Sequence, residues 1–316
     1  MRIVFLGTGD FGAPALAALL KARHQVSAAI SQPDRPAGRG REIRPTPIHA
    51  AADALGLRHI QAEDVNAEEL GPVWGEAEIG VVAAFGQKIG PAILRRLPRG
   101  CINLHGSLLP KYRGAAPIQR AIISGDETSG VTVFQLDERW DTGAIWATRA
   151  TCIGESETAD ELHDRLAGLA ADLLIDTLAG ITAGTLQPQP QDPAQATRAP
   201  KLTKAEGVVD WTQPARLVAR RINGLWSWPA AAALFRSRSG KQERVLLARA
   251  APADPDAPPT ADLPPGAVAT DLAVQTGAGR VRILEVKPAG GKRMPFEAFA
   301  NGRRIAPPDV FLPVEP

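Results

Sequence analysis

Apolar residues in the first part of the chain gather in short runs, and stretches with helical spacing separate these runs. The first run ends at a glycine and leads through an amphipathic stretch into a second run, which is the pattern of a β-α-β unit. The predicted strands are Arg2–Leu6, Gln25–Ile30, Ile79–Phe85, Cys101–Leu104 and Val131–Leu136, and the predicted helices between them are Ala13–Lys21, Pro47–Leu55, Ala92–Leu97 and Ile118–Ile123. This alternation predicts an α/β fold with a mostly parallel sheet that helices cover on both faces.

The pattern changes after an amphipathic segment at Thr158–Ile181. Residues 187–200, QPQPQDPAQATRAP, are rich in Pro and Gln and typical of an extended linker. Beyond them we expect a helix at Ala215–Asn223 and a mobile loop at Ala250–Pro265. Short β-type runs predict a small barrel, and they lie at Ala231–Phe235, Val245–Ala248, Ala267–Ala269, Leu272–Gln275 and Val281–Val286.

The composition limits the class of protein. A chain of 316 residues exceeds the usual size of one hydrophobic core, so we expect two domains. Hydrophobic residues make up 44% and charged residues 22%, which excludes disordered and fibrous classes. No apolar run approaches the roughly 20 residues that cross a bilayer, and no export signal is evident, so we expect a cytoplasmic protein without membrane contact. Cys101 and Cys152 are too few for a disulfide framework or a zinc cluster, and we expect both to be buried thiols.

The distribution of charge is uneven although the formal net charge is only +2. Residues 201–316 hold 17 Lys or Arg and 11 Asp or Glu, whereas acidic side chains outnumber basic ones before residue 201. A basic second half is compatible with binding to a polyanion and equally with a solvated basic surface.

Two segments near the N-terminus each have two interpretations. Residues 7–12, GTGDFG, match a dinucleotide-binding pattern with Asp34 downstream, but Asp34 lies in a turn, so a tight strand-to-helix turn is favoured. Residues 31–47, SQPDRPAGRGREIRPTP, contain too many Pro and Gly residues to pack into a core. This loop is either inert and solvated or offers guanidinium groups to phosphates, and its arginines are Arg35, Arg39, Arg41 and Arg44.

The richest segment is CINLHGSLLPKYRG, residues 101–114. Strand alternation places Asn103 and His105 on one face, where a parallel strand is normally apolar. The carboxyl end of such a strand is where open α/β sheets bind ligands, so a functional role is favoured over a structural one. After the next strand, Asp137 and Asp141 either act on His105 as acid-base partners or only cap backbone groups of a turn, and the sequence leaves both possibilities open.

Several long segments closely resemble the methionyl-tRNA formyltransferase family, one of the folate-dependent formyltransferases. They span nearly the whole chain and are VFLGT at 4–8, QPDRPAGRG at 32–40, VVAAFGQ at 81–87, CINLHGSLLPKYRGAAPIQRAI at 101–122, LDERWDTGAI at 136–145, KLTKAEGVVDW at 201–211 and WP at 228–229. The resemblance implies a Rossmann-like formyltransferase domain at 1–188, a linker at 189–206 and an OB-like, tRNA-binding β-barrel domain at 207–316. It implies transfer of the formyl group of 10-formyltetrahydrofolate to the amino group of methionyl initiator tRNA, for translation initiation.

The resemblance also implies roles for individual residues. Asn103, His105 and Asp141 would be catalytic, with Asp141 holding and charging His105. No metal is implied, and we expect a monomer. Folate would contact Phe85, Gly86, Gln87, Lys88, Ile89, Ser107, Leu108, Leu109, Pro110 and Asp137, and the tRNA acceptor stem would contact Arg35, Arg39 and Arg41.

Departures from the family and two alternatives remain. Gly9 stands where the family has proline, and Arg139 and Trp140 replace a small and an apolar residue before Asp141. A sugar-nucleotide formyltransferase would share the Asn, His and Asp residues but would not need the arginine loop. A catalytically inactive tRNA-binding protein would keep the basic surface and tolerate changes at the three residues.

Overall fold

The computed structural model describes residues 1–37, 42–253 and 263–314, which divide into two compact units. Unit 1 comprises residues 1–117, 129–151 and 163–199, and unit 2 comprises residues 118–128, 152–162 and 200–316 apart from the undescribed positions. The chain therefore passes between the units more than once. The predicted domains, 1–188 and 207–316, are each one continuous stretch of chain. These boundaries stay a prediction.

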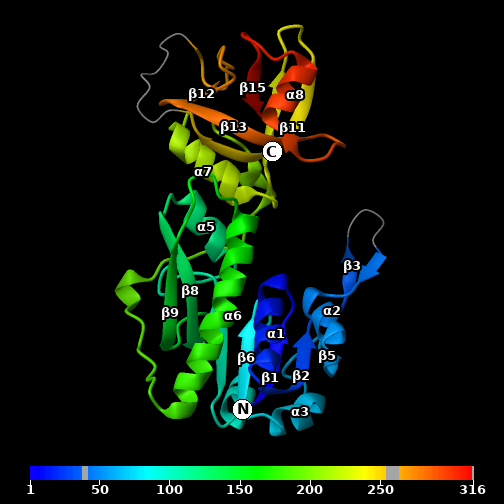
Figure 1. The fold of residues 1–316 in the computed structure, drawn as a ribbon, viewed down its shortest axis with the longest axis vertical. Helices are drawn as coiled ribbons and strands as arrows, with labels where there is room; N and C mark the ends of the chain where they lie inside the picture. Colours follow the sequence, from blue (N-terminus) through cyan, green and yellow to red (C-terminus); the bar gives the residue numbers. More distant parts are fainter. Residues whose placement is uncertain (38–41, 254–262, 315–316) are drawn as a thin grey trace. The chain divides into compact units, whose positions relative to one another are not determined.

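Unit 1 is built on a seven-stranded sheet with the strand order β5-β2-β1-β6-β7-β8-β9 (Figure 1). Strands β5 to β7 pair in parallel, and β8 runs antiparallel to β7. The strands are β1 Arg2–Gly7, β2 Gln25–Ser31, β5 His59–Gln61, β6 Ile79–Ala83, β7 Cys101–His105, β8 Thr128–Gln135 and β9 Ile145–Cys152. A separate hairpin joins β3 Arg35–Ala37 to β4 Glu42–Arg44.

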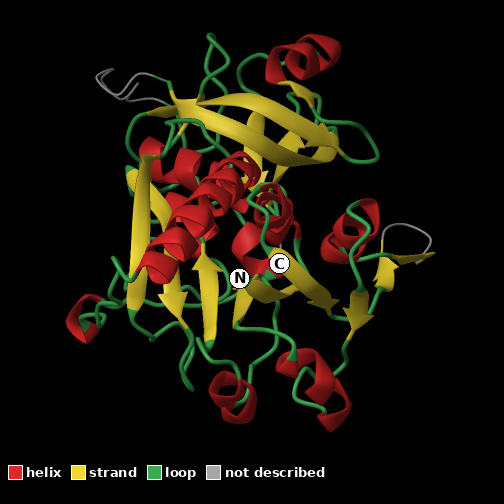
Figure 2. Ribbon diagram, turned by 60° about the horizontal axis from the view of Figure 1, so that its bottom comes forward, coloured by secondary structure: helices red, strands yellow, loops and turns green. Residues whose placement is uncertain are grey.

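Helices cover both faces of this sheet, as Figures 1 and 2 show. On one face Val4 and Leu6 pack with Trp74 and Ile93 from the helices after β5 and β6. The alternate residues of β1 face the other side, where α1 and α2 lie against β2. The helical elements of residues 1–199 are η1 Asp10–Gly12, α1 Ala13–Lys21, α2 Pro47–Ala54, η2 Glu68–Leu70, α3 Gly71–Gly75, α4 Pro91–Arg96, α5 Pro117–Ile123, α6 Ala159–Ala183 and η3 Pro193–Gln195. Of these, α5 apart from Pro117 and the first four residues of α6 belong to unit 2.

Unit 2 holds an antiparallel, nearly closed barrel with the strand order β12-β13-β11-β10-β15, and β14 pairs with β13. Bridges from Ala267 to Val310 and from Val268 to Val274 connect the two ends of this order. Four phenylalanines fill the interior, with Phe235 and Phe311 ring centroids 5.3 Å apart. The elements are η4 Lys204–Gly207, α7 Ala215–Leu225, β10 Ala231–Arg236, β11 Gln242–Pro252, β12 Val274–Gln275, β13 Arg280–Pro288, β14 Met294–Pro295, α8 Phe296–Arg303 and β15 Val310–Pro313.

The structure confirms the predicted fold class and corrects several elements. The predicted strand Ala267–Ala269 is reduced to isolated bridges, and the strands of two or three residues outside the predicted runs have too few residues to show a period. The helix α8 was not predicted because polar residues and Gly302 interrupt its short apolar pattern. Part of the expected mobile loop, residues 250–252, belongs to β11, and residues 254–262 lie outside the described part of the chain. Cys152 is exposed rather than buried, because it ends an edge strand whose alternate residues face outward.

The helix α6 bears on the expected absence of membrane contact. Within the described residues it is the one helix that is long and apolar enough to cross a bilayer. Half of its most apolar window is buried inside the protein, as in the core helix of a globular domain, so this feature is weak evidence for a membrane. Its hydropathy is not evident as one long apolar run in the sequence, because Asp and Arg residues interrupt every apolar run of the helix.

Candidate active site

Strand β7 carries Asn103 and His105 at the carboxyl end of the parallel part of the sheet. Asn103 pairs with Val82 of β6 and with Phe134 of β8, and His105 pairs with Thr132. The two side chains alternate with Leu104 and so share a face, as predicted. His105 is 6% exposed and Asn103 is half-buried. The fold therefore brings an amide and an imidazole together at the sheet edge.

The His105 ring is oriented by the loop that follows its own strand. Nε2 lies 2.9 Å from the carbonyl oxygen of Tyr112, and the ring meets Phe134 edge to face at 6.3 Å. A carbonyl only accepts hydrogen bonds, so Nε2 must carry a hydrogen and donate it. Nδ1 has no hydrogen-bond partner in the described ranges. This nitrogen is therefore available to a bound molecule.

Asn103 has an uncommitted amide group. Within residues 1–37, 42–253 and 263–314 its side chain makes no hydrogen bond, although it is half-buried. Neither polar atom of this amide is among the fully buried, unpartnered atoms, so both can bind water or a ligand. Asn103 can donate through its NH₂ group and accept through its carbonyl oxygen.

Asp141 is held by the segment that follows His105. Asp141 is 8% exposed, and its Oδ2 accepts a hydrogen bond of 2.8 Å from the Gly114 N–H. In the part of the chain that the structure describes, no hydrogen bond or ion pair joins Asp141 to His105. The two side chains are therefore not in direct contact by a hydrogen bond, and the predicted action of Asp141 on His105 stays a prediction. Strand and loop are joined through Gly114.

The turn before Asp141 is ordered by Asp137. Its carboxylate accepts hydrogen bonds from the Arg139 N–H at 3.0 Å and from the Thr142 hydroxyl at 2.7 and 2.8 Å. This is the capping role that the sequence left open for both aspartates. Trp140, in contrast, is 61% exposed at the tip of the turn.

Residues 85–89 form the loop after β6. The Phe85 carbonyl accepts hydrogen bonds from Thr8 Oγ1 and Gln32 Nε2 at 3.0 and 2.9 Å. The Gln87 amide is committed to backbone groups of residues 62 and 65. Gly86 is exposed with φ of 78°, Lys88 is exposed, and the side chains of Phe85 and Ile89 are buried. This loop can therefore meet a ligand mainly through its backbone at Gly86.

The turn Ser107–Pro110 packs against β8. The Ser107 hydroxyl donates to the Lys111 carbonyl at 2.7 Å, and the Leu109 N–H donates to Thr132 Oγ1 at 3.0 Å. Leu108 and Pro110 are half-buried, whereas Ser107 and Leu109 are buried. The turn is anchored beside the carboxyl end of β7 and leaves Leu108 and Pro110 open to contact.

The arginine loop begins as the β3–β4 hairpin. Arg35 is exposed, and its Nη2 donates to Gln32 Oε1 at 3.2 Å. Asp34 binds His49 and the Thr46 N–H, and although burial opposes ionisation, these hydrogen bonds lower the pKa of its carboxyl. Arg39 and Arg41 lie outside the described residues.

Asp34 and the glycine-rich turn do not support dinucleotide binding. The Asp34 carboxylate is engaged by protein groups, and the N–H groups of Thr8 and Gly9 donate to the Ala84 carbonyl at 3.2 and 3.3 Å. These N–H groups would have to be free to bind a pyrophosphate. The favoured interpretation, a tight strand-to-helix turn, agrees with these contacts.

Three residues near the site were missed because they lie in the segment expected to be a linker. The Tyr112 N–H donates to Thr197 Oγ1 at 2.8 Å, and the Ala199 N–H donates to the Arg113 carbonyl at 2.7 Å. Gln191 contacts both the Asp141 loop and Arg113. The alternation of Gln with Pro at 187–191 was the available signal, because alternate residues of an extended segment share one side. Composition alone favoured a linker.

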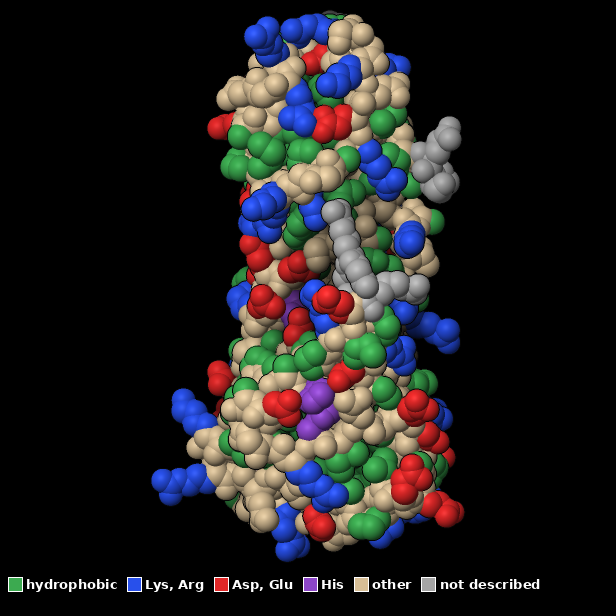
Figure 3. Space-filling model, turned by 90° about the vertical axis from the view of Figure 1, so that its right-hand side faces the viewer, with side chains coloured by type: hydrophobic (Ala, Val, Ile, Leu, Met, Phe, Trp, Pro, Cys, Tyr) green, Lys and Arg blue, Asp and Glu red, His purple; other side chains and the backbone are tan. Residues whose placement is uncertain are grey.

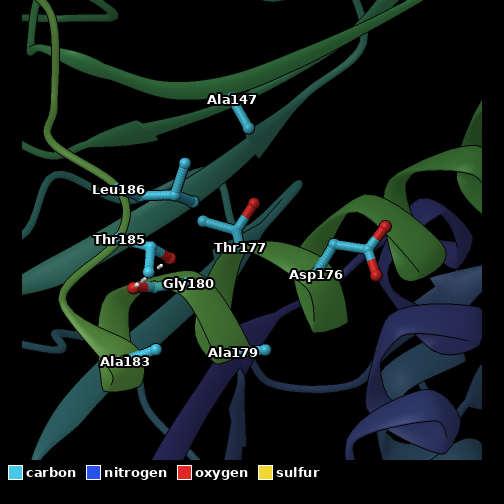
Figure 4. Close-up of a pocket in the computed structure, with 8 residues that line it drawn as sticks. All are labelled: Ala147, Asp176, Thr177, Ala179, Gly180, Ala183, Thr185 and Leu186. Carbon is cyan, nitrogen blue, oxygen red and sulfur yellow. Dashed lines mark hydrogen bonds between the residues drawn. The ribbon is translucent and has the colours of Figure 1, made fainter.

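A surface groove of about 450 Å³ lies elsewhere in unit 1, between α6, β9 and residues 185–186 (Figure 4). Small and apolar side chains line it, with Asp176 as the charged group, and none of the predicted site residues contributes. On the face shown in Figure 3, basic and acidic side chains are interspersed rather than gathered in one patch. Among the described residues no cluster of His, Cys, Asp or Glu could hold a metal ion.

Comparisons with known proteins show which families this chain is similar to. Residues 1–178 match the formyl transferase family, and residues 201–304 match the formyl transferase C-terminal domain. Methionyl-tRNA formyltransferase of Heliobacterium modesticaldum is 43% identical over 319 residues, which cover 97% of this chain and 98% of the relative. The enzyme of the same name from Halorhodospira halophila is 45% identical over 313 residues, with 97% of each chain covered.

Solved structures show the same fold. A sugar 3N-formyl transferase superposes with a TM-score of 0.65 at 14% identity, covering 89% of this chain and 96% of that one. HypX of Aquifex aeolicus in complex with tetrahydrofolic acid gives a TM-score of 0.62 at 19% identity and covers 95% of this chain and 47% of that one. At such identities the likeness concerns the fold alone.

Proposed function

The chain belongs to the methionyl-tRNA formyltransferase family, and from this premise we propose how its own residues carry out the reaction. It is a formyl-transferring enzyme that uses 10-formyltetrahydrofolate and formylates the amino group of methionyl-tRNA. The product, N-formylmethionyl-tRNA, serves translation initiation. The assignment of residues rests on one observation. Asn103 and His105 share one face of β7, and each has a hydrogen-bonding group that no described residue occupies.

The chemistry requires donors for a developing negative charge. The amine nitrogen of methionine attacks the formyl carbon, and the π electrons of the formyl C=O bond move onto its oxygen. We propose that the Asn103 NH₂ group and His105 in its protonated form donate hydrogen bonds to this oxyanion. When the oxyanion collapses, the bond from carbon to the folate nitrogen breaks, and that nitrogen takes up a proton.

Asp141 is the proposed proton acceptor. Its Oδ2 is committed to the Gly114 N–H, whereas Oδ1 has no partner in the described residues. Oδ1 can therefore take the proton that the attacking amine loses, directly or through a water molecule. This role does not need a contact with His105.

We propose that folate lies along one loop and two turns. The loop 85–89 offers the exposed backbone of Gly86, and Ser107–Pro110 forms the neighbouring wall. The Asp137 carboxylate is engaged as a cap, so the turn it orders would contribute through its backbone groups. Backbone donors and acceptors of this kind can read the polar edges of a pterin ring.

The proposed tRNA contacts are Arg35, Arg39 and Arg41. Arg35 is exposed, and its one described side-chain hydrogen bond, to Gln32, is long. A guanidinium group can pair with two phosphate oxygens at once. We propose that the C-terminal barrel of residues 207–316 adds phosphate contacts, that residues 1–188 form the catalytic domain and that residues 189–206 join them. We also propose a cytoplasmic monomer that works without a membrane.

A formyl-transfer assay tests the acceptor. The purified protein is given 10-formyltetrahydrofolate with methionyl initiator tRNA, elongator methionyl-tRNA or a UDP-aminosugar. We expect rapid transfer to the initiator tRNA alone. Transfer to the sugar alone would leave the Asn, His and Asp assignment in place but contradict the acceptor, and transfer to none would favour an inactive tRNA-binding protein.

Arg39 tests the recognition loop in the same assay. We expect Arg39→Ala to weaken tRNA binding and flatten its dependence on salt concentration, with the rate at saturating tRNA little changed. Equal loss of tRNA affinity in Arg39→Ala and His105→Ala would contradict the separation of recognition from catalysis.

A further inference from the structure

Gln191 connects the loop that carries Asp141 to the loop that follows His105. Its Nε2 donates to the carbonyl oxygens of Asp141 at 3.0 Å and Gly143 at 2.8 Å. Its Oε1 accepts from Nε and Nη2 of Arg113 at 3.1 and 2.7 Å. A side-chain amide has two donor hydrogens and two acceptor lone pairs, so Gln191 uses its full hydrogen-bonding capacity here.

These contacts close a ring around Asp141. The Asp141 carboxylate binds the Gly114 N–H, Gly114 follows Arg113 in the chain, and Arg113 binds Gln191. Gln191 then returns to the Asp141 carbonyl. Both the side chain and the backbone of Asp141 are therefore connected to the loop after His105. The side chain binds Gly114 directly, and the backbone is connected through Gln191.

The Asp141 backbone needs such support. Its φ of 55° lies in the left-handed region, which Asp tolerates better than most residues but which still costs free energy relative to the right-handed region. Contacts from the surrounding structure stabilise this conformation. The hydrogen bond from Gln191 fixes the carbonyl group of Asp141, the left-handed residue itself.

The segment that holds Gln191 is itself anchored on both sides. Gln189 and Ile145 exchange two backbone hydrogen bonds of 2.8 Å. On the other side, residues 197–199 pair with residues 112–116. Gln191 is half-buried between these two anchors, so its amide is presented to the Asp141 loop in a defined place.

We infer that Gln191 is a positioning residue for formyl transfer, which holds Asp141 in the orientation that accepts a proton. This inference rests on the proposed role of Asp141 and adds a residue from the stretch between the two matched domains. A misplacement of about 1 Å in a reacting group can cost roughly 10²-fold in rate, so loss of the Gln191 contacts should appear in the chemical step.

The test compares three variants in single-turnover formyl transfer to methionyl initiator tRNA. Gln191→Ala removes all four hydrogen bonds, and Gln191→Glu keeps the side-chain size and an acceptor for Arg113 but cannot donate to the two carbonyls. We expect both to slow transfer by about 10- to 100-fold, with KM for each substrate within about threefold of the wild type. Gln189→Ala is the matched control, because among the described residues that side chain makes one hydrogen bond, to the Gln187 carbonyl, and it should keep the wild-type rate.

A double-mutant cycle with Asp141→Asn separates positioning from general destabilisation. If Gln191 acts through Asp141, adding Gln191→Ala to Asp141→Asn should slow the residual reaction by less than about threefold. A full additional loss in the double variant, or a wild-type rate in Gln191→Glu, would overturn the inference. Full activity of Asp141→Asn would instead overturn the proposed role of Asp141 itself. If Gln191→Ala fails to fold, the cycle is run with Gln191→Glu, and the same outcomes decide.

Discussion

The backbone N–H of Gly114 donates a hydrogen bond of 2.8 Å to Oδ2 of Asp141, across 27 positions of the chain. Gly114 lies in the loop after the strand of Asn103 and His105, so this bond joins that loop to the loop of Asp141. Gly114 has φ of 129°, and a Cβ atom there would lie 2.6 Å from the Ala199 carbonyl oxygen. Only glycine can therefore present its N–H to Asp141 in this place.

Gly114→Ala should lower the rate of formyl transfer by about 10- to 100-fold, because the clash with Ala199 moves the N–H away from Asp141. Steady-state kinetics measures this loss. Gly56→Ala is the control: Gly56 also has positive φ, of 65°, but nothing lies within 4 Å of its added Cβ. That variant should lose about 1 kcal/mol of stability at unchanged rate. Equal rate losses in the two variants would refute the role of the Gly114 contact.

His105→Ala should lower kcat by about 10²- to 10⁴-fold, because it removes the imidazole whose Nδ1 is open to the substrate. The affinity for tRNA, measured by filter binding, should stay the same, since His105 is buried whereas Arg35 of the arginine loop is exposed. His24→Gln, which loses only a contact with the N-terminal amine, is the matched control. A kcat within threefold of the wild type would exclude His105 from the chemistry.

Asn103→Asp should lower the single-turnover rate by about 10²- to 10³-fold. The carboxylate has nearly the shape of the amide but cannot donate a hydrogen bond to an oxyanion. Its negative charge also repels the negative charge of the oxyanion. Folding should be preserved, because the Asn103 side chain has no hydrogen bond to lose among the described residues. Weaker folate binding with an unchanged rate at saturation would assign Asn103 to ground-state binding instead.

His163 predicts a pH dependence of stability in unit 1. Its Nε2 lies 3.2 Å from Asp10 and its Nδ1 3.1 Å from Asp164, and the hydrogen bond with Asp10 above all raises the pKa of His163. The same bond lowers the pKa of the Asp10 carboxyl below its ordinary 3.8. The His163 contribution is therefore complete below about pH 6.5 and lost as pH rises through the raised pKa. The Asp10 contribution is lost as pH falls through the lowered pKa.

His163→Gln should thus destabilise the protein most between these limits. Because Asp10 is largely exposed, the loss at pH 5.5 should be at most about 1 kcal/mol, and it should shrink toward pH 9. Urea unfolding at the two pH values measures the difference. A loss that grows toward alkaline pH would contradict the sign of this linkage.

The sequence predicted those parts of the fold that have a strong period. Strands β1, β2, β6 and β7 are largely buried in a parallel sheet, so most of their residues are apolar and the runs have clear ends. Edge strand β9 alternates half-buried with exposed residues and carries Arg149, so its hydrophobic signal is weak. The three-residue strands are stabilised by tertiary pairing rather than by any local preference.

For the candidate site, the sequence predicted which side chains matter better than it predicted their contacts. Asn103 and His105 could be placed on one face because strand alternation is a local property. The partner of Asp141 could not be predicted, since a bond from a backbone N–H 27 residues away depends on how two loops pack. Gln191 was missed for the same reason: its hydrogen bonds are all long-range, and its Pro-rich surroundings are typical of a linker.

The pairing of residues 189–199 with the loops of unit 1 has a practical consequence for dissecting this enzyme. A fragment cut after residue 188 would retain every strand of the seven-stranded sheet but lose Gln191 and the Thr197 and Ala199 partners of the loop after His105. Its loops would then lack their outer support, although the sheet beneath them stays complete. The smallest fragment worth expressing as an autonomous catalyst therefore extends at least to Ala199.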